Sequence, residues 1–242
     1  NYMSLYHEYD VVRAEQFWRR DFARFKQDGV TTISISLYWI LLESNTRGIY
    51  GNAFLNNIRT FLSIANEYGL QVIVTFHTLW GDDSLWCTPT YVVDPISNNN
   101  NGLAIVRSSD MYNAFMDMVI YTVTYLKGYP KWCYAINEPW YWGRTDTEID
   151  FITDNGKTQK ENFITLFQDL SNTVKSTEPA INFTVRFGCA ATYNNDQNIK
   201  NLFEEQWSWD QRIFSALDFI GFTSYIPTNN AVMSTWRQYV NY

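Results

Sequence analysis

The sequence predicts an α/β fold in which a parallel sheet is covered by helices. Two observations support this prediction. Short apolar segments with strand-like alternation are separated by longer segments with helical periodicity, an order that is typical of parallel sheets. The strand segments are mostly apolar, as parallel strands buried on both faces usually are. The chain has 242 residues and is 46% hydrophobic, so we expect one large domain over residues 1–242.

Each element follows from its own pattern of side chains. Trp18, Phe22 and Phe25 recur at helical spacing, and Gly29 ends that helix. In the following strand, apolar odd-numbered positions alternate with polar or small even-numbered ones. By the same reasoning, strands are expected at Asn1–Tyr6, Thr31–Trp39, Leu70–His77, Lys131–Glu138, Ile181–Cys189 and Leu217–Tyr225. Helices are expected at Glu15–Asp28, about Ala53–Tyr68, Met111–Leu126, Asn162–Ser176 and about Ile199–Phe214.

The six predicted strands favour a closed barrel over an open nucleotide-binding sheet. A doubly wound sheet usually has a glycine-rich turn after its first strand, and neither GxGxxG nor GxxxxGK[ST] occurs in this sequence. We therefore expect a (β/α)8 TIM barrel with about six βα units present, lacking the start of strand one and strands seven and eight. A nucleotide-linked oxidoreductase is disfavoured because no phosphate-binding loop is found.

Composition excludes several other functions. The net charge of −7 and pI of about 4.8 disfavour nucleic-acid binding, because no basic patch offsets the acidic balance. The most apolar stretch, Met116–Leu126, is too short and too interrupted by polar residues to span a membrane. Cys87, Cys133 and Cys189 are too scattered for a disulfide framework or a zinc site, so we expect buried thiols.

The candidate site lies where the predicted strands end, because barrel active sites are built at the carboxyl ends of the strands. Glu138 precedes Pro139, which favours extended backbone and ends the strand with that carboxylate at the edge of the sheet. Partial desolvation of a glutamate favours its protonated form, which suits a general acid. The residues that end the predicted strands are Trp39, His77, Asn137, Glu138 and Tyr225.

Aromatic residues are more abundant than a core requires. The chain contains 10 Trp, 17 Tyr and 16 Phe, and flat aromatic faces suit the apolar C–H faces of sugar rings. Trp80 lies in the long loop 78–108, and Trp140 lies two residues after the candidate acid. Together with Trp39, these two residues are candidate contacts for a saccharide. With only two histidines in the chain, a metal site is not expected.

Several segments carry a resemblance to a known family. The stretch from Asp28 to His77 includes Gly48-Ile49-Tyr50, the tripeptide Asn137-Glu138-Pro139 ends the fourth predicted strand, and Leu217–Tyr225 forms the sixth. Taken together, these segments resemble glycoside hydrolase family 5, or another family of the same retaining (β/α)8 clan. The likeness covers nearly the whole chain, and the tripeptide gains its weight from its place at the end of a strand.

The resemblance implies roles for particular residues. Glu138 would be the acid/base, Asn137 would bind the sugar 2-hydroxyl, and His77 and Tyr225 would line the site. Retaining chemistry needs a second carboxylate about 5–5.5 Å from the acid/base. In this clan it is a glutamate that ends strand seven, which we expect beyond residue 242. The sequence departs from family 5 at two positions, Ser34 and Thr223, where that family usually has arginine and histidine.

We therefore expect a retaining glycoside hydrolase that cleaves O-glycosidic bonds in a β-linked polysaccharide or oligosaccharide. Cellulose-like β-glucan and mannan are the substrates that the resemblance implies most directly, and no cofactor is expected. The alternative is a non-catalytic carbohydrate-binding or structural module on a degenerate barrel, which the absence of the strand-seven carboxylate and the serine at position 34 both leave open. Secretion is expected because polymeric substrates lie outside the cell.

Overall fold

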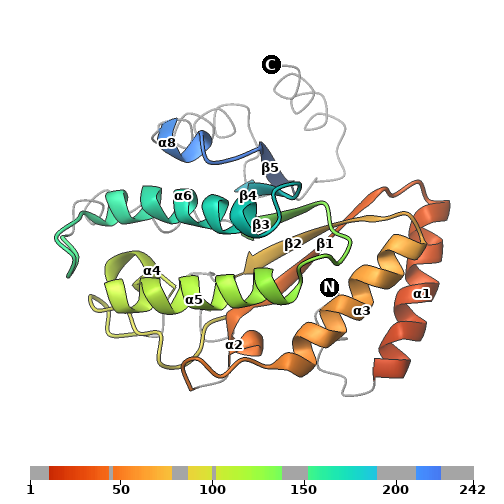
Figure 1. Cartoon of the computed structure of the whole chain (residues 1–242), viewed down its shortest axis with the longest axis horizontal. Coiled ribbons are helices and arrows are strands. Elements are labelled where there is room, and N and C mark those ends of the chain that lie inside the picture. The colour runs from red at the N-terminus through yellow and green to blue at the C-terminus, as the bar shows by residue number, and fades with distance from the viewer. Residues whose placement is uncertain are drawn as a thin grey trace.

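The fold is built on one five-stranded parallel sheet (Figure 1). The computed structural model describes residues 11–43, 46–77, 87–99, 102–137, 152–189 and 211–224. All neighbouring strands are parallel, and the order in the sheet follows the order in the chain. The strands are β1 (Thr32–Tyr38), β2 (Gln71–His77), β3 (Cys133–Asn137), β4 (Asn182–Cys189) and β5 (Phe219–Ser224).

This strand order identifies the sheet as part of a (β/α)8 barrel, as predicted. In a doubly wound sheet the strand order reverses at a switch point, whereas here each strand lies beside its predecessor in the chain. The five strands correspond to the second to sixth predicted strands. The strand predicted at Asn1–Tyr6 lies outside the described residues.

Helices follow the strands and cover one face of the sheet (Figure 1). Gly29 follows the helix at Val11–Gln27 and Gly69 follows the helix at Asn52–Glu67, with positive φ angles of 77° and 71°, which agrees with the predicted helix stops. Two four-residue helices were not predicted, because four residues are too few to show helical periodicity. The helices are α1 (Val11–Gln27), α2 (Trp39–Leu42), α3 (Asn52–Glu67), α4 (Ala104–Arg107), α5 (Ser109–Tyr125), α6 (Gln159–Thr177) and α8 (Gln211–Phe214). Of the helix predicted at about Ile199–Phe214, only α8 lies within the described residues.

The strands have two chemically different faces. The outer face packs against the helices and is apolar, with Leu37 and Phe76 fully buried in the core. The inner face has small and polar residues such as Ser34 and Thr75, whose hydroxyls lie 3.0 Å apart. The predicted alternation along the first of these strands is therefore confirmed. Cys87 and Cys133 are buried, as expected, and burial raises the pKa of the Cys133 thiol to about 12.

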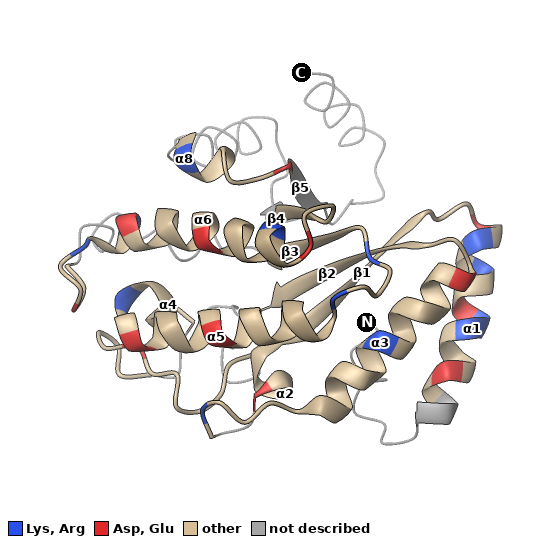
Figure 2. Cartoon of the chain, viewed as in Figure 1, with Lys and Arg blue, Asp and Glu red and all other residues tan. Residues whose placement is uncertain are grey.

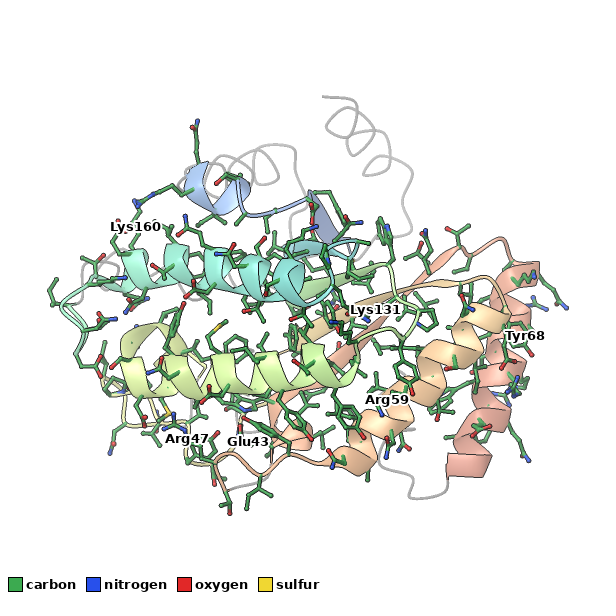
Figure 3. All side chains as sticks on the ribbon, viewed as in Figure 1. Glu43, Arg47, Arg59, Tyr68, Lys131 and Lys160 are labelled. Atoms are coloured by element: carbon green, nitrogen blue, oxygen red, sulfur yellow. The ribbon has the colours of Figure 1, made fainter. Side chains whose placement is uncertain are left out.

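Part of the aromatic surplus joins α3 to α5 on the outside of the sheet. The Tyr50 and Tyr121 rings stack at 4.2 Å, and Tyr121 stacks on Tyr125 at 5.9 Å. The Arg59 guanidinium lies 3.6 Å from the Tyr125 ring centroid and 4.8 Å from that of Tyr129. Figure 3 shows Arg59 on α3 near the end of α5. These rings stabilise helix packing, because their faces are covered by one another or by the guanidinium.

Within the described ranges, no helix is long and apolar enough to cross a membrane. Lys, Arg, Asp and Glu residues lie mainly on helices and turns (Figure 2). Of the residues in the five strands, Arg186 in β4 is the only one of these four types.

Candidate functional site

The candidate site is the carboxyl edge of the sheet, where polar side chains of neighbouring strands meet. Tyr38 and His77 are register partners that end β1 and β2. Asn137 ends β3 and is the register partner of Arg186 in β4. Partners in a parallel ladder face the same side of the sheet, so each pair shares a face. The structure therefore places His77 and Asn137 at the ends of adjacent strands, as the sequence predicts.

His77 is an uncharged side chain packed against an aromatic ring. It stacks on Tyr38, with the ring centroids 4.7 Å apart and the planes inclined by 26°. Its Nδ1 is buried without a hydrogen-bond partner in the described part of the chain. Burial, with a smaller contribution from the Arg186 charge, lowers the pKa of His77 to about 4. At neutral pH the imidazole therefore offers one donor and one acceptor and no charge.

Asn137 is fully buried at the end of β3. Neither its Oδ1 nor its Nδ2 has a hydrogen-bond partner among the residues that the structure describes. A buried amide without partners is costly and uncommon in folded proteins. Such an unpaired amide is expected at a functional site, because residues that lower local stability concentrate at functional sites.

Arg186 places a positive charge on the inner face of the sheet. Its Nη1 donates to Ser34 Oγ at 3.3 Å, so the side chain reaches from β4 to β1. The Ser34 hydroxyl in turn lies 3.0 Å from that of Thr75. Sequence reasoning missed Arg186 as a site residue. The available signal was one charged residue within the otherwise uncharged segment Ile181–Cys189.

Trp39 does not join these side chains, and its placement does not support the expected contact with a saccharide. It begins α2 on the helix-facing side, with 0% of its surface exposed. Its Nε1 donates to Glu43 Oε2 at 2.6 Å, and its ring packs edge-on against Phe115 at 5.5 Å. The reason is the strand alternation, which puts odd-numbered positions of this segment on the outer face.

Glu43 is a buried carboxylate that supports the turn after α2 (Figure 3). Besides the Trp39 indole, it accepts a hydrogen bond from the Gly48 backbone N–H, and it pairs with Tyr50 in an isolated antiparallel bridge. Burial together with the Glu43 charge raises the pKa of Tyr50 to about 12. These contacts give Glu43 a structural role behind the sheet.

The segment that follows β2 is anchored by a buried ion pair. Arg107 Nη1 lies 2.7 Å from Asp94 Oδ2, and both side chains are at most 2% exposed. Arg107 Nε also donates to Gln159 Oε1 of α6 at 2.8 Å. Asp94 accepts further hydrogen bonds from the Ile96 backbone N–H and the Ser97 hydroxyl. This network ties part of the long segment 78–108 to α6.

Four predicted site residues lie outside the described residues: Glu138, Tyr225, Trp80 and Trp140. Glu138 directly follows Asn137, so the described edge of β3 stops at the residue before the candidate acid. In the ranges that the structure covers, no group of three or more His, Cys, Asp or Glu side chains is arranged to hold a metal ion.

The low pKa of His77 predicts acid sensitivity of folding. An unfolded chain protonates His77 near pH 6.5, whereas the folded protein does so only near pH 4, so stability is lost as the pH falls between these values. Replacing His77 with Gln should remove about 2 kcal/mol of the stability loss between pH 7 and pH 5. Urea unfolding of both proteins at the two pH values measures this, and equal losses would show that His77 is not the group responsible.

Comparison with known proteins places the fold among glycosidases. No protein-family model and no curated protein sequence matches the chain significantly. Among solved structures, the exo-β-1,4-mannosidase Op5Man5 from Opitutaceae bacterium strain TAV5 is similar with a TM-score of 0.51 at 14% identity. The β-glycosidase BGL167 gives a TM-score of 0.56 at 13% identity, and a GH5_18 from Bifidobacterium longum subsp. infantis gives 0.56 at 15%.

These matches cover most of this chain and smaller parts of the other proteins. They span 71%, 92% and 78% of this chain but 28%, 64% and 41% of the mannosidase, the β-glycosidase and the GH5_18 protein. The chain thus covers less than two thirds of the length of each of these structures. At such low identities the likeness establishes the fold, and the predicted resemblance to (β/α)8 glycoside hydrolases is confirmed at that level.

Proposed function

We propose that the protein carrying this chain hydrolyses O-glycosidic bonds in β-linked saccharides, with Glu138 as general acid/base. One observation supports this most directly. Asn137 ends β3 at the carboxyl edge of a barrel sheet, beside the strand that ends in His77, with a buried amide that has no partner among the described residues. Glu138 is the next residue, and active sites of such barrels are built at this edge.

The chemistry needs a proton donor for the leaving oxygen and a group that stabilises or attacks the anomeric carbon. In the proposed site, Glu138 protonates the leaving oxygen and later activates water. The Asn137 amide donates to a sugar hydroxyl, and uncharged His77 contributes a donor or an acceptor beside it. Tyr225, Trp80 and Trp140 are proposed to line the cleft around the sugar ring. A retaining mechanism also requires a second carboxylate as nucleophile.

For the substrate, we infer β-linked hexosides, and mannosides or glucosides in particular. The proteins that share the fold are named as an exo-β-1,4-mannosidase and a β-glucosidase, and one GH5_18 structure from Streptomyces cattleya is a complex with Manβ1-4GlcNAc. These names support a β-linked substrate class, of which cellulose-like glucan and mannan are polymeric members. An extracellular location is proposed because polymeric substrates of this class lie outside the cell.

Hydrolysis assays on the protein that carries this chain test the proposal. We expect release of p-nitrophenol from the β-mannoside or the β-glucoside, and none from the matching α-anomers. ¹H NMR of the first-formed product should show the β-anomer, which identifies retention. Binding of β-linked oligosaccharides without any hydrolysis would instead support the non-catalytic module. If the protein neither binds nor hydrolyses them, both hypotheses are rejected.

A further inference from the structure

Arg186 carries a positive charge on the inner face of the described sheet. No other Lys, Arg, Asp or Glu occurs within the five strands that the structure describes, and its guanidinium contacts Ser34 of β1 across the inner face of the sheet. Arg186 is partly buried, and its hydrogen bond to the exposed Ser34 hydroxyl is accessible to solvent. This contact therefore does not belong to the packing of the core, and it places the guanidinium at the open inner face of the sheet.

The contacts form a chain of hydrogen bonds across the sheet. Arg186 Nη1 donates to Ser34 Oγ at 3.3 Å, which leaves the Ser34 hydroxyl proton available for Thr75 Oγ1 at 3.0 Å. Thr75 precedes His77 by two residues on the same face of β2, which corresponds to about 7 Å along the strand. The chain of hydrogen bonds therefore lies one layer beneath the His77 ring.

The Tyr38 and His77 rings above this layer stack on each other, and the Arg186 charge acts on both. Burial raises the pKa of the Tyr38 phenol, and the Arg186 charge opposes that rise. In the described part of the chain, Tyr38 from β1 and Arg186 from β4 are the titratable or charged groups that face His77, while β3 contributes the neutral Asn137 amide.

We propose that Arg186 is a positioning residue of the candidate active site. Its guanidinium, through Ser34 and Thr75, supports the layer beneath the stacked Tyr38 and His77 rings, and its charge adds to the effect of burial in keeping the imidazole uncharged. Because a cation repels a second proton, His77 stays a neutral hydrogen-bonding group at the edge of the sheet. The expected effect of Arg186 on catalysis rests on the proposed function, whereas its expected effect on the His77 pKa does not.

The titration of His77 tests the proposal directly. Its resonance in ¹³C-histidine-labelled protein is identified by its loss in the His77→Gln variant. In the Arg186→Met variant we expect the His77 pKa to rise by about one pH unit from its value of about 4. Arg186→Lys keeps a cation and should leave the His77 pKa near the wild-type value. Arg212→Met, which removes an arginine paired with Glu161 on the helical surface, is the matched control and should change nothing.

Activity gives a second readout. If hydrolysis occurs, the acid limb of the kcat/KM profile should move to higher pH in Arg186→Met, so that the activity at pH 5 relative to pH 7 falls about twofold. Should Arg186→Met fail to fold, Arg186→Gln removes the same charge and keeps a hydrogen-bond donor. An unchanged His77 pKa in the folded charge-removing variant overturns the proposal, even if the enzyme is active. A raised pKa in an inactive protein supports it and rejects only the proposed function.

Discussion

Replacing Glu138 with Gln is expected to lower kcat/KM for β-linked disaccharides by about 10²- to 10⁴-fold, the usual contribution of a positioned general acid/base. Gln is nearly isosteric with Glu and cannot donate a proton to the leaving oxygen. The loss should be larger for substrates with poor leaving groups, because activated aryl glycosides depart without protonation. Steady-state kinetics on a β-linked disaccharide and on the dinitrophenyl β-glycoside of the same sugar measure this dependence.

A chemical rescue sharpens the prediction. In Glu138→Ala, small anions such as azide should attack the covalent intermediate and give a β-glycosyl azide, since that step no longer needs a general base. The control is Glu161→Gln on α6, which removes an exposed carboxylate paired with Arg212 and should leave kcat/KM unchanged. Equal activity of Glu138→Gln and wild type on the disaccharide would remove Glu138 from the mechanism.

Breaking the buried Asp94–Arg107 pair is expected to have the largest effect on stability. Arg107→Met leaves the Asp94 carboxylate, which is 0% exposed, without its cation, and such a change costs about 3–5 kcal/mol of unfolding free energy. The loss of the Gln159 hydrogen bond adds to the cost. Urea unfolding followed by circular dichroism measures the difference between variant and wild type.

Two comparisons separate the ion pair from the general effect of losing an arginine. Arg212→Met removes a cation whose partner Glu161 is about half exposed, and exposed pairs contribute about 0–1 kcal/mol. The double variant Asp94→Leu/Arg107→Met removes both charges and should recover most of the loss, because no unpaired charge remains. A loss for Arg107→Met no greater than that for Arg212→Met would contradict this account of the network.

The barrel architecture could be predicted from the sequence because each strand and long helix carries its own periodic signal. The alternation in β1, the stripe of apolar residues in α3 and the glycines that end α1 and α3 are local features, and the structure confirms them. The helices α2 and α4 have only four residues each, and no periodic signal exists at that length. Their positions depend on tertiary contacts, such as the Cys87 carbonyl that accepts from the Ile40 N–H.

The candidate site was predictable only where a strand end could be read from the sequence. His77 and Asn137 end β2 and β3, as their strand patterns indicate. Trp39 shares the apolar outer face with Leu37, as the alternation predicts, and it starts a helical turn there, so its buried ring does not support the expected contact with a saccharide. Arg186 was missed since its side chain acts on β1, and a contact between residues 152 positions apart has no local signal.

The sequential order of the strands has a consequence for biosynthesis. Each strand pairs with the one synthesised just before it, so every new βα unit meets an edge that is already in place as the chain leaves the ribosome. Within the described sheet, each pairing spans one helical connection rather than several, which limits the entropic cost of closing each loop. The sheet can thus grow by one βα unit at a time, and each new strand provides the edge on which the next strand pairs.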